Sequence, residues 1–195
     1  MHRVISMCLD AAVAALMLVP LFFFLNKHCF HSKVRTVFYS LLAVYLSGMF
    51  SVVGLPDIRY VRFDPNFNFV PFAYMFSDFT NSLLNVLLFL PLGFFLPVLW
   101  LPYRQLRRTV FFGLCISLLI EALQIFTFRA TDVNDLITNT VGTVLGWVIA
   151  KCSFCFSPKI IPRSNCRELY LVCFSAFFVM FFLQPFLADW LFQYI

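Results

Sequence analysis

Six apolar segments of about 20 residues follow one another along the chain, and they constrain its fold more than any other feature. A helix needs about 20 predominantly apolar residues to cross the hydrocarbon core of a bilayer. A soluble domain carries about 45–50% apolar residues, whereas this chain carries 62% and has a mean hydropathy of +0.91. We therefore predict an all-α, polytopic transmembrane helix bundle of about six helices. The predicted spans are residues 7–25, 36–55, 80–100, 110–128, 133–150 and 169–191.

Residues 1–195 are expected to form a single membrane domain, because repeats and low-complexity linkers are absent from the sequence. The apolar stretch after Arg3 has the general pattern of a signal peptide. It continues to Leu25 without a convincing small-residue cleavage site before Lys27. We therefore expect this stretch to be a retained helix.

Lys and Arg are distributed unevenly between the two sides of this predicted bundle. The first, third and fifth loops hold ten of the fourteen basic residues, and the other side holds four. Cytoplasmic loops of membrane proteins are enriched in Lys and Arg. We therefore expect the ten-residue side in the cytoplasm and both termini outside the plasma membrane. The net charge is +5, but the basic residues lie in short loops between apolar segments, where they indicate orientation. Nucleic-acid binding is therefore not expected.

The second loop, residues 56–79, is rich in aromatic residues. Aromatic side chains at such density favour the headgroup level of a bilayer. We expect this loop to lie on the outer leaflet or to dip into it.

Polar residues of the hydrophobic part gather near the ends of three neighbouring spans. Glu121 and Gln124 share one helix face in the fourth span, because they are three residues apart. A carboxylate within a span is costly, so it needs a partner, a water-filled cavity or a proton. Asn85 lies in the outer half of the third span, which Pro91 and Gly93 are expected to interrupt.

The fifth span presents a polar strip followed by glycines. At about 100° per residue, one helix face would carry Asp132, Asp135, Asn139, Gly142 and Gly146. The two glycines form a G-x-x-x-G pattern, which allows close approach of another backbone. Asp132 is also favoured as a helix cap. With Arg129, which precedes this strip, we expect a shared polar pocket that opens outward; the alternative is that these groups only hold the bundle together.

With these residues in view, the chain resembles the VanZ-like family. That family's core reads approximately N-x-x-P-F, N-x-x-x-F-x-P-x-G-F, E-x-x-Q and then R-x-x-D-x-x-D-x-x-x-N-x-x-G. The resemblance covers about residues 68–150, and the first two and the sixth spans carry no matching motif. The matching positions are Asn68, Pro71, Phe72, Asn85, Phe89, Pro91, Gly93, Phe94, Glu121, Gln124, Arg129, Asp132, Asp135, Asn139 and Gly142.

The resemblance implies a bacterial plasma-membrane protein with a link to lowered susceptibility to teicoplanin, a lipoglycopeptide antibiotic. A broader role in the cell envelope is equally compatible with it. It supplies no mechanism and no oligomeric state.

Three functions remain open from the sequence. The first is a non-enzymatic protein whose outward pocket binds an amphipathic or lipid-linked ligand. Its ligand-binding residues would be Asn68, Asn85, Glu121, Gln124, Arg129, Asp132, Asp135 and Asn139. The second is an intramembrane enzyme that acts on a lipid-linked envelope precursor, with Glu121, Asp132 and Asp135 as acid–base groups or as ligands of a divalent cation. The third is a small transporter or a structural partner of a membrane complex. The first reading requires no cofactor.

Overall fold

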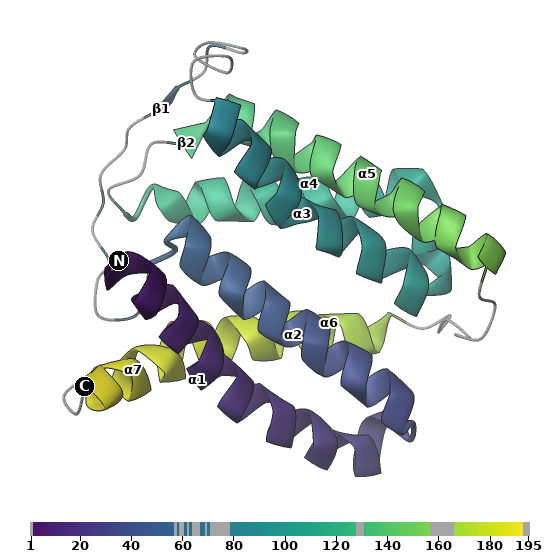
Figure 1. The fold of residues 1–195 in the computed structure, drawn as a ribbon, viewed down its shortest axis with the longest axis horizontal. Helices are drawn as coiled ribbons and strands as arrows, with labels where there is room; N and C mark the ends of the chain where they lie inside the picture. Colours follow the sequence, from purple (N-terminus) through teal and green to yellow (C-terminus); the bar gives the residue numbers. More distant parts are fainter. Residues whose placement is uncertain are drawn as a thin grey trace. The chain divides into compact units, whose positions relative to one another are not determined.

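The computed structural model describes residues 2–56, 58, 61, 63, 67–68, 70, 79–127, 131–156 and 166–192. These residues are almost entirely helical (Figure 1). The helices are α1 (His2–Leu25), α2 (Lys33–Val53), α3 (Phe79–Leu99), α4 (Leu106–Gln124), α5 (Val133–Phe156), α6 (Arg167–Phe178) and α7 (Gln184–Phe192). The π-helical segment η3 (Val179–Leu183) joins α6 directly to α7, so both belong to one long helix. The all-α prediction of about six helices is therefore confirmed.

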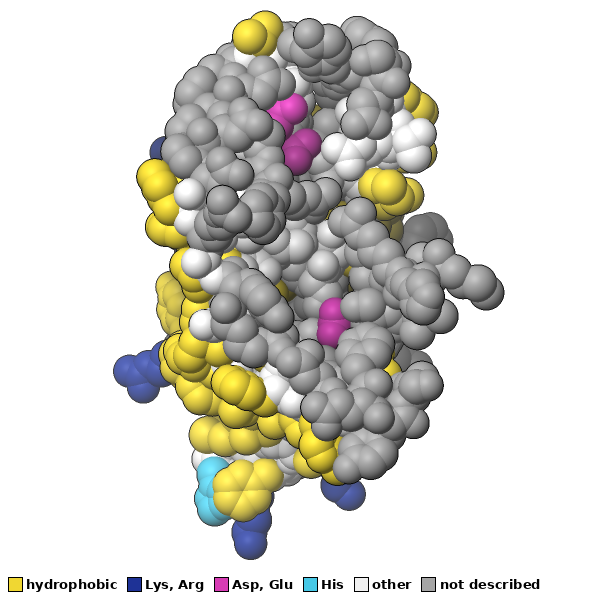
Figure 2. Space-filling view, turned by 90° about the vertical axis from the view of Figure 1, so that its left-hand side faces the viewer, with side chains coloured by type: hydrophobic (Ala, Val, Ile, Leu, Met, Phe, Trp, Pro, Cys, Tyr) yellow, Lys and Arg dark blue, Asp and Glu magenta, His cyan; other side chains and the backbone are white. Residues whose placement is uncertain are grey.

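Four helical segments are long and apolar enough to cross a membrane. They are Leu9–Phe30, Lys33–Val53, Phe79–Leu99 and Arg167–Leu187. The other two predicted spans correspond to α4 and α5, in which Arg107, Arg108, Glu121 and the polar strip after Asp132 reduce the apolar character. Large hydrophobic side chains are exposed on all of these helices, and Figure 2 shows such side chains gathered at the lower left of the face in view. This pattern is typical of helices that face lipid.

The described residues group into two compact units. The first comprises Met1–Arg62 and Arg167–Ile195, with α1, α2 and the long carboxyl-terminal helix. A π-helical turn, η1 (Asn26–Phe30), leads from α1 toward α2. The Asn26 side chain stabilises this turn, because its Oδ1 accepts hydrogen bonds from the Ser32 backbone N–H and the Thr36 hydroxyl at 2.8 and 2.9 Å. The Tyr39 hydroxyl donates to Glu168 and so connects α2 to α6.

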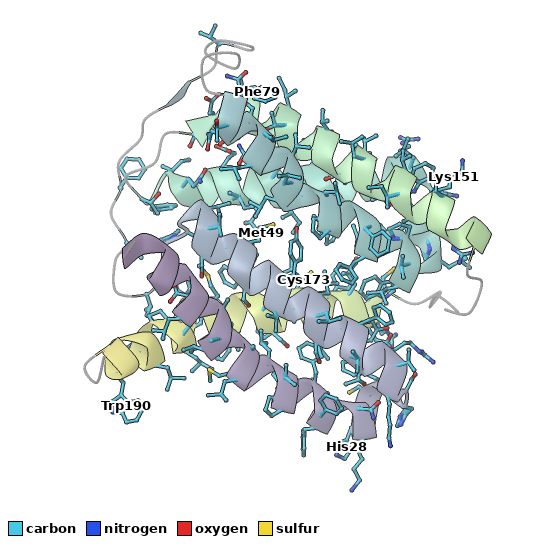
Figure 3. All side chains as sticks on the ribbon, viewed as in Figure 1. His28, Met49, Phe79, Lys151, Cys173 and Trp190 are labelled. Atoms are coloured by element: carbon cyan, nitrogen blue, oxygen red, sulfur yellow. The ribbon has the colours of Figure 1, made fainter. Side chains whose placement is uncertain are left out.

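The second unit, Phe63–Cys166, contains α3, α4 and α5. A short 3-10 helix, η2 (Leu101–Arg104), connects α3 to α4. Two parallel two-residue strands pair with each other: β1 (Phe67–Asn68), which precedes α3 in the chain, and β2 (Thr131–Asp132), which directly precedes α5. In this unit Phe79 and Lys151 lie at opposite ends (Figure 3). The amino-terminal ends of α3 and α5 therefore lie at the same end of the unit. The hydrogen bond between Glu121 and the Asp132 backbone N–H brings the carboxyl-terminal part of α4 there as well.

The structure corrects one detail of the third span. We expected Pro91 and Gly93 to interrupt it, but α3 is one continuous helix that contains both Pro91 and Pro97. A proline removes a single N–H donor, and a membrane helix tolerates this when the rest of its backbone hydrogen bonds persist.

Two other sequence expectations are left open by the structure. The aromatic loop 56–79 lies mostly outside the described residues. The organisation of residues 1–195 as one membrane domain stays a prediction.

Candidate functional site

The site is built on direct backbone contact between α3 and α5. A Cβ atom on Gly142 would overlap the carbonyl oxygen of Val86, and one on Gly146 would overlap that of Leu90. In the other direction, a Cβ on Gly93 would overlap the carbonyl oxygen of Thr143. Glycines on both helices therefore allow the backbones to touch, as small residues do in membrane helix pairs. The advance of four residues on each helix shows that α3 and α5 run parallel.

This parallel packing brings Asn85 of α3 to Asp135 in the first turn of α5. The Asn85 Nδ2 donates a hydrogen bond to Oδ1 of Asp135 at 2.7 Å. Asp135 also lies at the positive end of the α5 dipole, which favours a carboxylate there. The amide and the helix terminus together stabilise a negative charge that would otherwise be costly within the bundle.

Glu121 supports the start of α5 from the carboxyl-terminal part of α4. Its side chain is buried, and Oε2 accepts a hydrogen bond from the backbone N–H of Asp132 at 2.9 Å. The backbone carbonyl of Glu121 accepts a second bond from the Thr131 hydroxyl at 3.2 Å. A carboxylate thus holds the segment that enters α5.

Asp132 connects three parts of the site. Its Oδ1 accepts from the backbone N–H of Asn134 at 2.8 Å, so it caps α5 in the way its position predicts. Its backbone belongs to β2, where Asp132 is in register with Asn68 of β1. The residue that begins the N-x-x-P-F pattern therefore lies beside the amino-terminal end of α5.

Asn139 forms a hydrogen bond with α4. Its Nδ2 donates to the Ser117 hydroxyl oxygen at 2.9 Å, and both residues are buried. Among the described atoms, Oδ1 of Asn139 has no hydrogen-bond partner. The polar strip of α5 is therefore divided, since Asp135 bonds to α3 and Asn139 bonds to α4.

The structure describes some, but not all, of the other site residues predicted from the sequence. Gln124 is buried at the end of α4. Arg129, Pro71 and Phe72 lie outside the described residues, and Asn68 is placed by its backbone pairing alone. Phe89 is fully buried, and Pro91 is half-buried.

Several polar residues of this region were missed by sequence reasoning. Ser117 is the main one, because a serine on an apolar helix gives little signal by itself. It lies four residues before Glu121 and thus on the same helix face, which could have drawn attention to it. Thr138 and Thr143 are also buried, but their hydroxyls return to the α5 backbone carbonyls of Asn134 and Asn139. The two threonines therefore contribute to helix packing rather than to an open polar surface.

The arrangement is rich in hydrogen-bond acceptors and carries a local negative charge. Glu121, Asp132 and Asp135 come from α4, β2 and α5, and each already accepts a hydrogen bond. Such a site favours a cation or a ligand head that presents donors. Among the side chains that the structure places, no group of three His, Cys, Asp or Glu residues is close enough to hold a metal ion. Binding of a divalent cation to the acidic residues stays a prediction.

Comparison with known proteins gives one family. The VanZ/LLP1 family matches residues 11–156. Protein VanZ of Enterococcus faecium is 40% identical over 80 residues, which represent 40% of this chain and 48% of that protein. The match therefore spans about half the length of this relative. No solved structure matches the chain.

Proposed function

The chain belongs to the VanZ/LLP1 family, and on this premise we propose that it lowers bacterial susceptibility to lipoglycopeptide antibiotics such as teicoplanin. In this proposal, a polar pocket formed by α3, α4 and α5 binds an amphipathic or lipid-linked ligand. Binding of such a ligand near the membrane surface reduces access of the lipidated antibiotic to its target.

The observation that carries the proposal is the convergence of polar side chains from three helices at one end of the second unit. Asn85 of α3 bonds to Asp135 of α5, and Glu121 of α4 bonds to the residue that caps α5. A bundle that needed only stability would gain little from three carboxylates at one end of the same unit. Polar and ionisable residues within membrane spans are costly, and they commonly mark functional sites.

The distribution of charge supports an outward orientation of this end. In the second unit, Lys151 near the end of α5 is exposed at the end opposite the polar site. The exposed Arg104, Arg107 and Arg108 lie at η2 and the start of α4, which the hydrogen bond from Trp147 to Arg104 joins to this part of α5. In the first unit, Lys27 and Lys33 lie around the turn between α1 and α2. Basic loops favour the cytoplasm. We therefore propose a multi-pass protein of the plasma membrane whose polar site and termini are extracytoplasmic.

The chemistry of the site suggests the kind of ligand. Carboxylates and amide oxygens accept hydrogen bonds, so a ligand head with hydroxyl or ammonium donors would be complementary. Arg129 would supply a positive charge for an anionic part of the same ligand. The exposed hydrophobic side chains at this end, including Phe79 and Leu83, are available to the acyl part.

The proposal is tested by three single substitutions at the site: Glu121→Gln, Asp135→Asn and Asn139→Ala. Each variant is expressed at the wild-type level in a susceptible Gram-positive host, and the inhibitory concentration of teicoplanin is measured. We expect each variant to lose the protection that the wild-type chain gives. The control is Cys115→Ala, an exposed position on α4 that should keep full protection. If all three site variants protect as well as wild type, the pocket does not account for resistance.

The same strains separate binding from catalysis. An enzyme acting on a lipid-linked precursor would change the composition of these precursors in the membrane. Mass spectrometry of the lipid fraction from wild-type and Glu121→Gln cells should show no difference if the chain only binds its ligand. A precursor that accumulates in the variant would favour the enzymatic alternative.

A further inference from the structure

A basic patch occupies the end of the second unit that lies opposite the polar site. It consists of Arg104 at the end of η2, Arg107 and Arg108 in the first turn of α4, and Lys151 near the end of α5. All four side chains are exposed. They come from three elements, so the fold rather than a single run of sequence assembles this surface.

Trp147 organises the patch. Its Nε1 donates a hydrogen bond to the backbone carbonyl of Arg104 at 3.2 Å, which connects α5 to η2. The Lys151 Nζ lies 5.1 Å from the centre of the Trp147 ring, within the range of a cation–π contact. Tryptophan is enriched at the level of lipid headgroups. The indole thus holds two basic residues together at the depth where a headgroup would meet them.

The patch and the acidic residues are far apart along the same helices. Arg107 and Glu121 are separated by 14 residues on α4, or about 21 Å, at 1.5 Å per residue. Asp135 and Lys151 are separated by 16 residues on α5, or about 24 Å on the same basis. Within the described part of this unit, Glu121, Asp132 and Asp135 are the acidic residues, and all three lie away from the patch. Since the hydrocarbon core is about 30 Å thick, the two charged ends belong near opposite membrane surfaces.

Hydrophobic side chains are exposed next to the basic ones on these helices. Leu106 and Phe111 of α4 are 39% and 67% exposed, and Val148 of α5 is 44% exposed. Basic side chains beside an apolar surface are complementary to an anionic phospholipid, whose phosphate lies above its acyl chains. A nucleic acid would use the charges but would leave this apolar surface in water.

We propose that the basic patch binds the phosphate group of an anionic phospholipid, in the leaflet opposite the polar site. Arg104 and Arg107 would contact the phosphate, Lys151 would add charge, and the apolar side chains would lie along the acyl chains. This inference does not depend on the ligand of the polar site or on antibiotic resistance. It concerns a second surface of the same unit.

The test uses the full-length protein in a neutral detergent and two probes, phosphatidylglycerol and phosphatidylcholine. Binding is measured by native mass spectrometry of lipid retention and by the rise in the unfolding midpoint during lipid titration. Each basic residue near an anionic lipid surface contributes to the binding affinity. The double variant Arg104→Gln/Arg107→Gln should therefore bind phosphatidylglycerol roughly thirtyfold more weakly than wild type. Arg104→Lys/Arg107→Lys keeps the charge and should retain most of the phosphatidylglycerol binding. This result would show that these two positions can be substituted without loss of the site.

A matched control removes the same number of charges elsewhere. Lys27→Gln/Lys33→Gln changes two exposed residues of the first unit and should leave phosphatidylglycerol binding nearly unchanged. Equal loss in both double variants would indicate attraction by net charge and would overturn the proposed site. It would also be overturned if the wild type bound both lipids equally, or if inorganic phosphate or a short RNA displaced phosphatidylglycerol.

Discussion

Asn85 and Asp135 are 50 residues apart in the sequence, yet their side chains are joined by a hydrogen bond of 2.7 Å between α3 and α5. The amide is the donor and the carboxylate is the acceptor. On α3, Asn85 directly precedes Val86, whose backbone meets Gly142. On α5, Asp135 lies about two helical turns before Gly142, at 3.6 residues per turn. The polar contact and the glycine contact therefore position the same two helices, one by hydrogen bonding and the other by close packing.

Removal of the Asn85 amide should destabilise this pair of helices. Asn85→Ala removes the Asn85 amide as a donor to the Asp135 carboxylate, and a hydrogen bond to a charged group is worth about 1.5–3 kcal/mol. We expect a loss of this size in the free energy of unfolding, measured in detergent. Thr80→Ala is the control, because Thr80 is exposed on the same helix. In an Asp135→Asn background the effect of Asn85→Ala should shrink; an unchanged effect would mean that the two residues act separately.

The glycine positions between α3 and α5 should not tolerate even the small change from glycine to alanine. Gly146→Ala places a methyl group on the carbonyl oxygen of Leu90, a backbone atom that cannot move without displacing α3. We expect a loss of stability of about 1–3 kcal/mol, which is the usual effect of overpacking, or failure to fold. The matched control is Gly48→Ala on α2, where an added Cβ meets no atom within 4 Å.

At Gly48 the substitution should be neutral or should stabilise the helix by up to about 1 kcal/mol, because alanine is the better helix former. Size-exclusion elution and the thermal midpoint of both variants provide the comparison. Similar midpoints for Gly146→Ala and wild type would show that α3 and α5 are not in backbone contact.

Glu121 has a structural role that can be separated from its charge. Its Oε2 accepts from the Asp132 backbone N–H, and a glutamine retains an oxygen acceptor at the same place. Glu121→Gln should therefore keep nearly wild-type stability, whereas Glu121→Ala should lose about 1–3 kcal/mol, because the part-buried N–H of Asp132 loses this acceptor. Thermal unfolding of both variants tests this difference. If Glu121→Gln is as unstable as Glu121→Ala, the charge itself holds the fold, and loss of teicoplanin protection in Glu121→Gln would not report on ligand binding.

The helices could be predicted from the sequence because their signal is local. Runs of about 20 apolar residues identify membrane helices by length and hydropathy alone, and α1, α2 and α3 begin and end within a few residues of the expected positions. The spacing of Asp132, Asp135 and Asn139 likewise predicts a shared strip on α5. What such spacing cannot predict is the neighbour that each residue meets, since this depends on the crossing of helices that are distant in sequence.

Ser117 and the continuity of α3 illustrate this limit. Ser117 becomes important only because Asn139 is brought against it from another helix. Pro91 predicts a break from local propensity, but α3 continues through it, and the neighbouring Leu90 and Gly93 meet the backbone of α5. Contacts between distant segments of this kind are not shown by a single sequence.

The thiol of Cys166 should report on the basic patch through its reactivity. Burial raises the pKa of Cys166, and the positive charge of Arg108 partly opposes this rise. Since the thiolate is the reactive form, alkylation at pH 7 should be slow and should accelerate as the pH rises toward the pKa. Arg108→Gln removes the opposing effect, so the pKa should rise further and the reaction at a given pH should become slower.

The rate is measured with a water-soluble alkylating agent on a variant in which the other six of the seven cysteines are serine. Arg107→Gln serves as the control, because it removes the same charge from the neighbouring position but is not among the groups that shift Cys166. The profile of Arg108→Gln should be displaced to higher pH, and that of Arg107→Gln should match the parent. A faster reaction in Arg108→Gln would contradict the prediction, because it would mean that burial by the arginine side chain outweighs the effect of its charge.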